Sequence, residues 1–529
     1  MDAKMFFQND VSAQVVMDDV SDETISALLA RRARVHPDET YCTFNQERIT
    51  FRLLERRVNQ VATMLKAQGL ARGDRVAVML QGHPEHLYLI FALARLGMVR
   101  VPINVHLIGA PLKHLLTELD PKALVAEVAY RAAIEEADGL RSTVIWRNGV
   151  DGVFDGFAHC AEDHDATDVR ADDVIALSPS SGTTGAPKGV LKTDRHLRAG
   201  PLAVLRLTEA RHGDVFLFWE ALHHGSGVAV AIAALMGRFQ LAMVERFSAS
   251  RFWDDAREHQ ATHIHYLGSV LPMLLKQPAR VDDRQHGVRV AWGGGCPAHV
   301  WQAFAERFGV TMREGYGLSE LITFVTANVD GTPGSIGKPL SYYDISLVGD
   351  DGAPVPVGQT GEVVVQAHDA RLGFLGYFRN PKADAAARRA GSFMTGDLAH
   401  ADVHGNLFYA GRKKDMLRRR GINISAWDVE SVFAEHEAIA EVALVGVPSD
   451  LGEDELKLFV RVREGARVDP LDLIRWSSQR LPYFQIPRYV EFIDQFPKTP
   501  TQRIQKKDLS RHVAGVWDVA ATDFRPNKH

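Results

Sequence analysis

The sequence predicts an α/β protein in which alternating strands and helices build a parallel-rich sheet. The clearest signals come in order near the start: an amphipathic helix over 53–65 closed by Gly69, a strand over 75–80, a helix over 85–95 and a strand over 99–104. Alternation on this scale is typical of βαβ units. Since 529 residues exceed what one hydrophobic core usually organises, we expect two or more domains.

Composition and charge limit the function classes. The chain is 46% hydrophobic and 24% charged, as in ordinary globular proteins, and its net charge of −5 argues against a nucleic-acid binder held by a basic face. Cys42, Cys160 and Cys296 lie far apart without a metal-binding spacing, which fits a reducing compartment. No signal-peptide pattern opens the chain, and no apolar run approaches the roughly 18 residues of a membrane span. We expect a cytoplasmic protein without nucleic acid or integral membrane association, and a homodimer is one expected assembly.

A loop rich in glycine and hydroxyl residues follows the apolar run 174–177, which predicts a buried strand. The loop reads Ser180, Ser181, Gly182, Thr183, Thr184, Gly185, Ala186, Pro187, Lys188 and Gly189. Glycines let backbone N–H groups approach an anion, and a lysine adds a charge suited to phosphate. The spacing does not fit a Walker A loop. Although a solvated turn explains three or four such residues, ten in this order favour a phosphate-binding loop of another kind.

A pair of histidines follows the strand predicted at 215–219. Adjacent side chains point to different faces, and no third metal ligand stands nearby, so we expect His223 and His224 to line a pocket rather than to bind a metal. His224 is retained as a candidate catalytic residue.

The segment 288–298 imitates a dinucleotide-binding fingerprint. A strand is followed by Gly-x-Gly-x-x-Ala, and Glu314 stands about 20 residues further on. An NAD(P)-dependent oxidoreductase is therefore the rival class. Pro297 counts against it, because proline removes an N–H from the helix start that should hold the pyrophosphate.

The next motif, Glu314-Gly315-Tyr316-Gly317-Leu318-Ser319-Glu320, completes a recognisable order. Together with the 180–189 loop and the Gly-Gly-x-Pro turn at 294–297, it resembles the adenylate-forming superfamily, which includes AMP-forming acyl-CoA synthetases, luciferases and adenylation domains. Further matches stand at 334–339, 395–397, 411–415 and 421–425, and the resemblance runs from about residue 25 to 510.

The resemblance implies a large N-terminal domain with parallel-rich sheets flanked by helices and a small, mobile α/β C-terminal domain. We expect residues 1–411 to form the first and 412–529 the second, with a hinge near Lys414. The residues themselves agree, because 412–421 is a charge-dense break and the strand signals after it begin a new α/β unit.

The resemblance also implies an ATP-dependent ligase that converts a carboxylic acid to an acyl-adenylate and transfers the acyl group to CoA. The implied cofactors are ATP, Mg²⁺ and coenzyme A. Thr183 and Glu320 match the Mg²⁺-associated positions, and Asp397 matches the residue that accepts from the ribose hydroxyls. The candidate catalytic residues are Lys188, Glu320, Arg503 and His224. The candidate cofactor-binding residues are Ser180, Ser181, Gly182, Thr183, Thr184, Gly185, Lys188, Gly294, Gly295, Gly315, Tyr316, Gly317, Ser319, Asp397, Arg412 and Gly421.

One position departs from the family pattern. The C-terminal motif of the family carries a lysine that reaches the α-phosphate, whereas Gln502-Arg503 stands here in place of Gly-Lys. We expect Arg503 to act as the electrostatic clamp, since arginine keeps the charge and can bind two oxygens. The alternative is an enzyme with an impaired first step that handles preformed acyl-adenylates or serves a carrier protein.

The substrate acid is left open by the sequence. The chain is most similar to the carnitine/crotonobetaine–CoA ligase branch, where Trp219 and Glu220 would meet a quaternary ammonium by cation–π contact and charge. A fatty or aryl acid remains the alternative.

Overall fold

The computed structural model describes residues 22–137, 143–148, 154–162, 168–180, 188–268, 270–419, 422–448, 454–498 and 503–525. The chain divides into two compact units. Unit 1 comprises the chain up to Ile345 with Val365–Phe393 and His404–Leu407, and unit 2 comprises Ser346–Val364, Met394–Val403 and Phe408–His529.

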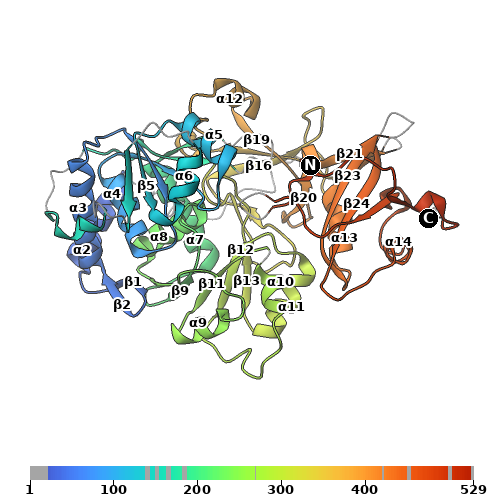
Figure 1. Ribbon diagram of the computed structural model, residues 1–529, viewed down its shortest axis with the longest axis horizontal. Coiled ribbons are helices and arrows are strands. Elements are labelled where there is room, and N and C mark those ends of the chain that lie inside the picture. Colours follow the sequence, from blue (N-terminus) through green and yellow to red (C-terminus); the bar gives the residue numbers. More distant parts are fainter. Residues whose placement is uncertain are drawn as a thin grey trace. The chain divides into compact units, whose positions relative to one another are not determined.

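Unit 1 contains a seven-stranded sheet in the order β13-β12-β11-β9-β10-β1-β2 (Figure 1). Its strands are β1 (Thr40–Phe44), β2 (Glu47–Thr50), β9 (Val215–Phe218), β10 (Gln240–Met243), β11 (His263–Leu267), β12 (Val290–Gly294) and β13 (Thr311–Glu314). All neighbours are parallel except β1 and β2, which form an antiparallel hairpin. The carboxyl ends of six strands therefore meet at one edge, where ligands bind in open α/β sheets.

A second sheet of unit 1 has six strands in the order β6-β5-β3-β4-β7-β8. They are β3 (Arg75–Met79), β4 (Val99–Pro102), β5 (Ala123–Glu127), β6 (Thr143–Arg147), β7 (Val174–Pro179) and β8 (Gly189–Thr193). Only β7 and β8 pair antiparallel. Near-continuous burial of β3 and β4 fits strands covered on both faces.

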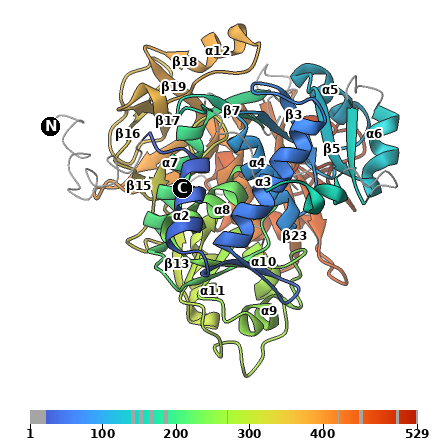
Figure 2. The same cartoon turned by 90° about the vertical axis from the view of Figure 1, so that its left-hand side faces the viewer.

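Helices cover these sheets. They are α2 (Ile25–Val35), α3 (Phe51–Ala67), α4 (Pro84–Arg95), α5 (Gly109–Leu119), α6 (Arg131–Ala137), α7 (Asp194–Thr208), α8 (Gly225–Gly237), α9 (Phe252–Glu258), α10 (Val270–Leu275) and α11 (Ala298–Phe308). A further helix, α12 (Pro381–Ala387), contacts the short strand β18 (Arg388–Arg389) of another sheet. Figure 2 shows α2, α3 and α4 side by side. Thr50 caps α3 by accepting from Leu53 N, and the chain leaves the helix through Gly69 at φ +72°.

Short strands follow α11, and the boundary between the units passes through four of them. These are β16 (Tyr343–Val348), β17 (Gly361–Ala367), β19 (Ser392–Ala401) and β20 (Leu407–Arg412). The others are β14 (Thr326–Ala327), which pairs with β15 (Lys338–Pro339), and β18 (Arg388–Arg389), which pairs with the start of β19.

Unit 2 is built around the four-stranded sheet β23-β24-β25-β26. Its elements are β21 (Met416–Arg419), β22 (Ile422–Ser425), α13 (Ala426–Ala434), β23 (Ile439–Pro448), β24 (Asp454–Val462), α14 (Pro470–Ser478), β25 (Tyr489–Phe492) and β26 (Trp517–Asp518). Successive residues of β24 alternate between two cores: Leu458 packs with α13 and α14 residues, and Phe459 packs with Phe496 and Leu509 on the other face.

The predicted α/β class with parallel-rich sheets and a separate C-terminal sheet is confirmed. Unit 2 takes in 346–364 and 394–403 besides the C-terminal residues, and the predicted domain division at 411/412 stays a prediction. A hinge near Lys414 stays a prediction, because compactness does not report motion. Within the described ranges, no helix is both long and apolar enough to cross a membrane.

Candidate active site

The ends of the glycine-rich loop are fastened together by the β7–β8 pair. Pro179 lies opposite Gly189, Ser180 N donates to Lys188 O at 2.8 Å, and Lys188 N donates to Ser180 Oγ at 3.0 Å. Residues 181–187, which include the predicted phosphate and Mg²⁺ positions Ser181, Gly182, Thr183, Thr184 and Gly185, lie outside the described residues. What the structure fixes is therefore the base of the loop, at the carboxyl end of β7.

Lys188 and Glu320 are brought together by a tyrosine. The Lys188 ammonium lies 5.0 Å from the centroid of the Tyr377 ring, and the Tyr377 hydroxyl donates to Glu320 Oε1 at 3.1 Å. Burial, followed by the negative charge of Glu320, raises the pKa of Tyr377 above its usual value, so the phenol stays protonated and donates.

A buried lysine fixes the chain beside Glu320. Lys192 of β8 is 6% exposed and its ammonium donates to the carbonyl oxygen of Leu321, the residue after Glu320. Burial lowers the pKa of Lys192 to about 8. Glu320 is thus held from two directions, by Tyr377 at its carboxylate and by Lys192 at the following peptide.

The glycine turn after β12 is supported by Glu314 rather than left open to a dinucleotide. The Glu314 carboxylate accepts from Gly295 N at 2.8 Å and from Cys296 N at 3.1 Å, and the Tyr266 hydroxyl lies 3.2 Å from it. Burial raises the pKa of Glu314 to about 7. Because this carboxyl group is already bonded to its own turn, it does not serve a ribose, and the oxidoreductase reading is not supported.

The tyrosine–glycine motif after β13 packs tightly on the chain that follows it. Tyr316 N donates to Thr326 Oγ1 at 3.1 Å, and Val325 N donates to Tyr316 O at 2.8 Å. A Cβ at Gly317 would lie 1.8 Å from Thr323 O, and one at Gly315 would lie 2.6 Å from the Phe324 ring. Only glycine fits at these two positions.

The predicted nucleotide-binding residues of unit 1 lie at the carboxyl ends of neighbouring strands. Gly294 ends β12, with Gly295 directly after it, and the Gly315–Gly317 motif follows β13. Gly294 is half-buried, Gly295, Gly317 and Ser319 are exposed, and Tyr316 is half-buried. They form one edge of the seven-stranded sheet, although their sequence positions are about 20 residues apart.

The chain after β9 places a buried carboxyl group beside a histidine. Glu220 is 4% exposed, its Oε1 lies 3.5 Å from His265 Nδ1, and Trp219 Nε1 donates to His265 O at 3.2 Å. Burial raises the pKa of Glu220 to about 8 and lowers the pKa of His265 to about 3, so both are mainly neutral at pH 7. A neutral Glu220 does not supply the charge that the sequence analysis assigned to it for a quaternary ammonium.

The two histidines stand at the start of α8. His224 is the N-cap residue, and its ring centroid lies 4.3 Å from that of His223. Burial lowers the pKa of His223 to about 2. Both rings are half-buried at the carboxyl edge of the sheet, a position suited to lining a pocket.

Four polar residues of unit 2 lie near one another: the predicted Asp397, Arg412 and Arg503, and Tyr409, which was not predicted. Asp397 is 4% exposed, Arg412 Nε lies 3.1 Å from Asp397 Oδ1, and the Tyr409 hydroxyl donates to the same oxygen at 3.4 Å. The backbone turn before Asp397 is fixed by Thr395 Oγ1, which accepts from Asp397 N at 3.0 Å. The positive φ of +69° at Gly396 makes this turn possible.

Arg503 joins this group across nearly 100 residues of sequence. Burial lowers the pKa of Arg503, the charge of Arg412 lowers it further, and Tyr409 and Asp397 raise it, so all four side chains are within electrostatic range. The Arg503 side chain keeps an exposed surface. The predicted residues Asp397, Arg412 and Arg503 therefore lie near one another within unit 2.

The loop that carries Arg503 is anchored to the unit 2 core. Lys498 and Ile504 form an antiparallel bridge, and Gln505 N donates to Pro497 O at 2.8 Å. Phe496, just before the loop, is packed in the core. Residues 499–502 and Gly421 lie outside the described residues, whereas Lys414 is described and burial lowers its pKa.

Three contributors were not found from sequence: Tyr377, Lys192 and Tyr409. Tyr377 and Tyr409 stand in segments without catalytic spacing, and Lys192 looks like a surface lysine on an edge strand. Each gains its role from residues between 12 and 189 positions away. Sequence spacing carries no signal for such contacts.

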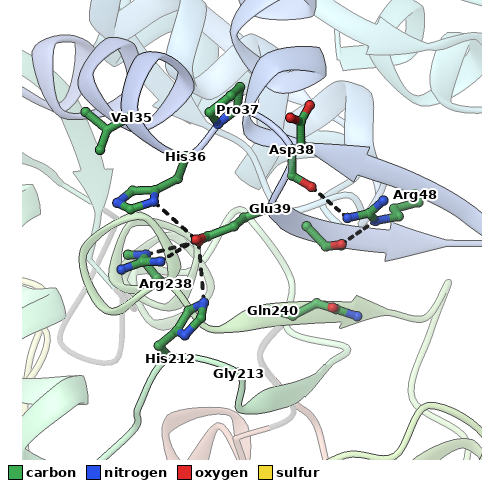
Figure 3. Close-up of a pocket in the computed structure, with 11 residues that line it drawn as sticks. Val35, His36, Pro37, Asp38, Glu39, Arg48, His212, Gly213, Arg238 and Gln240 are labelled. Carbon is green, nitrogen blue, oxygen red and sulfur yellow. Dashed lines mark hydrogen bonds and ion pairs between the residues drawn. The ribbon is translucent and has the colours of Figure 1, made fainter.

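The pocket of about 550 Å³ drawn in Figure 3 lies at the opposite edge of the seven-stranded sheet. Glu39 lies at its centre with Arg238 paired to it, His36 Nδ1 at 3.2 Å and His212 Nε2 at 3.6 Å. These residues precede β1, β9 and β10, so they stand at the amino ends of the strands. The ion pairs join loops there and are not part of the candidate active site.

A magnesium ion with ATP fits the residues present. Glu320 offers a partly exposed carboxylate, and oxygen ligands bridged to phosphates are what Mg²⁺ prefers. Among the described residues, no three His, Cys, Asp or Glu side chains form a metal-binding group. Of the two predicted Mg²⁺-associated residues, the structure describes Glu320, whereas Thr183 lies outside the described residues.

Comparison with known proteins gives one consistent family. Residues 29–378 match the family described as AMP-binding enzyme, and residues 428–503 match the AMP-binding enzyme C-terminal domain. The chain is 29% identical over 481 residues to a crotonobetaine/carnitine–CoA ligase of Escherichia coli O139:H28, covering 87% of this chain and 93% of that protein. It is 28% identical over 517 residues to a protein of the same description in Salmonella paratyphi C, covering 93% and 100%.

Solved structures give the same picture. ATP-bound MatB from Rhodopseudomonas palustris superposes with a TM-score of 0.82 at 25% identity, covering 91% of this chain and 97% of that one. An o-succinylbenzoate coenzyme A synthetase from Bacillus subtilis, in complex with ATP and magnesium ion, gives a TM-score of 0.82 at 23% identity, with 91% and 98% coverage. Because the identity to the Bacillus subtilis synthetase is only 23%, that similarity bears on the fold alone.

Proposed function

The chain belongs to the AMP-binding enzyme family, and we propose on this premise which of its residues carry out each half of the reaction. It is an AMP-forming acyl-CoA synthetase. In the first half, a carboxylate oxygen attacks the α-phosphorus of ATP, the bond to pyrophosphate breaks, and an acyl-adenylate forms. In the second half, the sulfur of CoA attacks the acyl carbon, and AMP leaves.

Charge neutralisation carries the first half, because one anion approaches a polyanion. Lys188, Ser180 and the loop residues 181–185 would bind the β- and γ-phosphates. Glu320 and Thr183 would hold Mg²⁺, which supplies charge neutralisation on the phosphates when bound. The base of the loop, pinned between Pro179 and Gly189, supports this assignment.

The nucleoside contacts are proposed from the family resemblance. Gly294, Gly295, Gly315, Tyr316, Gly317 and Ser319 would enclose the adenine. Asp397 would accept from both ribose hydroxyls, since a carboxylate has two oxygens to offer. Arg412, whose Nε lies 3.1 Å from Asp397 Oδ1, would orient that carboxylate.

Arg503 is the proposed clamp on the α-phosphate and the attacking carboxylate. The observation that carries this proposal is its place beside Arg412, Tyr409 and Asp397, the proposed ribose-binding residues. A guanidinium there matches two anionic oxygens at once. The competing function, an enzyme impaired in the first half, predicts that loss of this charge has no effect on pyrophosphate release.

The second half would use motion of the C-terminal domain about Lys414 and a channel lined near Gly421. Such closures confine their φ/ψ changes to a few residues. His224 would border the acyl site at the start of α8, where the helix dipole favours an anion such as the substrate carboxylate.

The substrate is proposed to be a short acid with a quaternary ammonium, after the two curated relatives. Burial keeps Glu220 neutral, so this residue would not supply a charge for the quaternary ammonium. The half-buried Trp219 would instead bind the cation with its ring face. A fatty or aryl acid is the alternative. Cytoplasmic location and a homodimer also stay proposals, which fractionation and light scattering test.

One assay tests the function and its alternatives. Purified protein is given ATP and each of carnitine, crotonobetaine, o-succinylbenzoate, anthranilate and fatty acids, with and without CoA, while AMP and pyrophosphate are measured. We expect AMP release that requires both an acid and CoA. Pyrophosphate release without thioester formation from free CoA would instead point to a carrier-protein acceptor.

A further inference from the structure

Tyr377 stands between the two charged residues assigned to the polyphosphate. Its side chain is 8% exposed, its ring carries the Lys188 ammonium at 5.0 Å from the centroid, and its hydroxyl donates to Glu320 Oε1 at 3.1 Å. Lys188 and Glu320 are both described, and neither forms an ion pair within 4.0 Å with another described residue. The two opposite charges are therefore near the same phenol without neutralising each other.

The backbone of Tyr377 is tied to the strand that begins after Lys188. Leu191 N donates to Gly376 O at 3.0 Å, and Phe378 N donates to Gly189 O at 2.7 Å. Tyr377 also forms an antiparallel bridge with Val190, and its N–H donates to Asp384 Oδ1 at 2.6 Å. The ring consequently keeps a fixed position relative to Lys188.

Glu320 is tied to the same strand from its other side. Lys192 lies four residues after Lys188 and donates to the carbonyl of Leu321. Because Lys192 is buried, this contact is shielded from water and holds the backbone of Glu320 against β8. The tyrosine then needs only to orient the carboxylate.

We propose that Tyr377 is a positioning residue that holds Lys188 and Glu320 ready for ATP and Mg²⁺ while preventing them from pairing with each other. A cation over a phenol ring is held weakly, so phosphate oxygens readily displace the ring from the ammonium. A direct Lys188–Glu320 ion pair would have to be broken before the nucleotide could bind. The inference rests on the roles proposed for these two residues.

Two substitutions separate the two contacts of the phenol. Tyr377→Phe keeps the ring and removes the hydroxyl on Glu320, and we expect the KM for ATP and the Mg²⁺ requirement to rise about tenfold. Tyr377→Leu removes both contacts and lets Lys188 approach Glu320. We expect this substitution to raise the KM for ATP and the Mg²⁺ requirement on the order of 50-fold. The KM values for the acid and for CoA should not change.

Binding and the second half-reaction provide readouts that a general structural defect would not produce. Calorimetry with Mg²⁺ and a non-hydrolysable ATP analogue should show the same loss of affinity, whereas thioester formation from a preformed acyl-adenylate should keep its wild-type rate. Tyr41→Phe is the matched control, since it removes a buried hydroxyl bond of 2.9 Å to Ala231 O in the same unit without touching the candidate site.

The outcomes distinguish this inference from the proposed function. If Lys188→Ala and Glu320→Gln weaken ATP binding but Tyr377→Phe leaves both the KM for ATP and the calorimetric affinity within about twofold of wild type, the positioning role is refuted alone. If Lys188→Ala and Glu320→Gln have no effect either, the assignment of the polyphosphate site fails first. A tenfold rise in the KM for ATP and in the Mg²⁺ requirement, with the KM values for the acid and for CoA unchanged, supports the inference.

Discussion

Replacing Arg503 by alanine is expected to slow acyl-adenylate formation about 100-fold and to leave transfer of a preformed acyl-adenylate to CoA within about threefold of wild type. The reason is that the first half brings a carboxylate onto the α-phosphate, whereas the second half does not add an anion to a polyanion. Arg503 lies within electrostatic range of Arg412 and Asp397, the residues proposed to bind the nucleotide, and its positive charge would stabilise the approach of the two anions.

The magnitude follows from the position of the side chain. Two unit charges about 4 Å apart interact by about 4 kcal/mol at an effective dielectric of about 20, and by about 1 kcal/mol in bulk water. Arg503 keeps an exposed surface, so a value between these limits applies. About 2.7 kcal/mol corresponds to a factor of about 100 in rate.

The assay measures the two half-reactions separately. Exchange between ATP and labelled pyrophosphate reports the first, and thioester formation from a synthetic acyl-adenylate reports the second. Arg503→Lys should recover most of the exchange rate, because it restores the charge without the fork. Arg461→Ala is the control, since it removes an arginine of the same unit that pairs with Glu441 at 2.7 Å.

Two results would refute the reasoning. Unchanged pyrophosphate exchange in Arg503→Ala would mean that the charge does not act on the first half, as in the competing function. An equal loss in both half-reactions would mean that the substitution disturbs unit 2 as a whole, and the anchored loop between Lys498 and Ile504 makes that loss unexpected.

Three further outcomes are expected. Asp397→Asn should raise the KM for ATP about tenfold and leave the KM for CoA unchanged in steady-state assays, because the amide accepts with only one oxygen; equal changes in both constants would contradict the ribose assignment. Gly317→Ala should abolish activity, because its Cβ would lie 1.8 Å from Thr323 O, and a crystal structure showing an unmoved loop would contradict this. The buried Glu220 has a pKa raised to about 8, so the unfolded chain ionises first and the free energy of unfolding falls as pH rises from about 4.5 to about 8. Glu220→Gln should therefore gain up to about 4 kcal/mol relative to wild type between pH 5 and pH 8.5 in thermal or denaturant unfolding, and a difference independent of pH would contradict the burial argument.

Secondary structure was predicted correctly where it depends on residues that are close in the sequence. The helix predicted over 53–65 is α3, and the glycine expected to close it has the positive φ that a helix end requires. The strands expected at 75–80 and 174–177 are β3 and β7. These elements depend on apolar spacing and on glycine, both of which can be read within a dozen residues.

The family could also be recognised from the sequence, because several motifs in a fixed order leave few alternatives. The sequence also offered a rival class, since Glu314 stands about 20 residues after a glycine turn, as in a dinucleotide-binding fingerprint. The tertiary structure decided the matter by bonding that carboxylate to Gly295 N and Cys296 N. Parallel strands bring residues about 20 positions apart to the same edge, and spacing alone does not say which groups then bond.

The partners of the charged residues could be identified only in the folded chain. Arg503 lies within electrostatic range of Arg412 and Asp397, and Tyr377 contacts Lys188 and Glu320, over separations of 57 to 189 residues in sequence. The ionisation of Glu220 was likewise decided by burial, which no neighbour in sequence reveals. Hydrogen bonds and desolvation depend on which residues lie close together in space, so they could not be predicted from the sequence. Periodicity and motif order depend only on the order of residues along the chain, so they could.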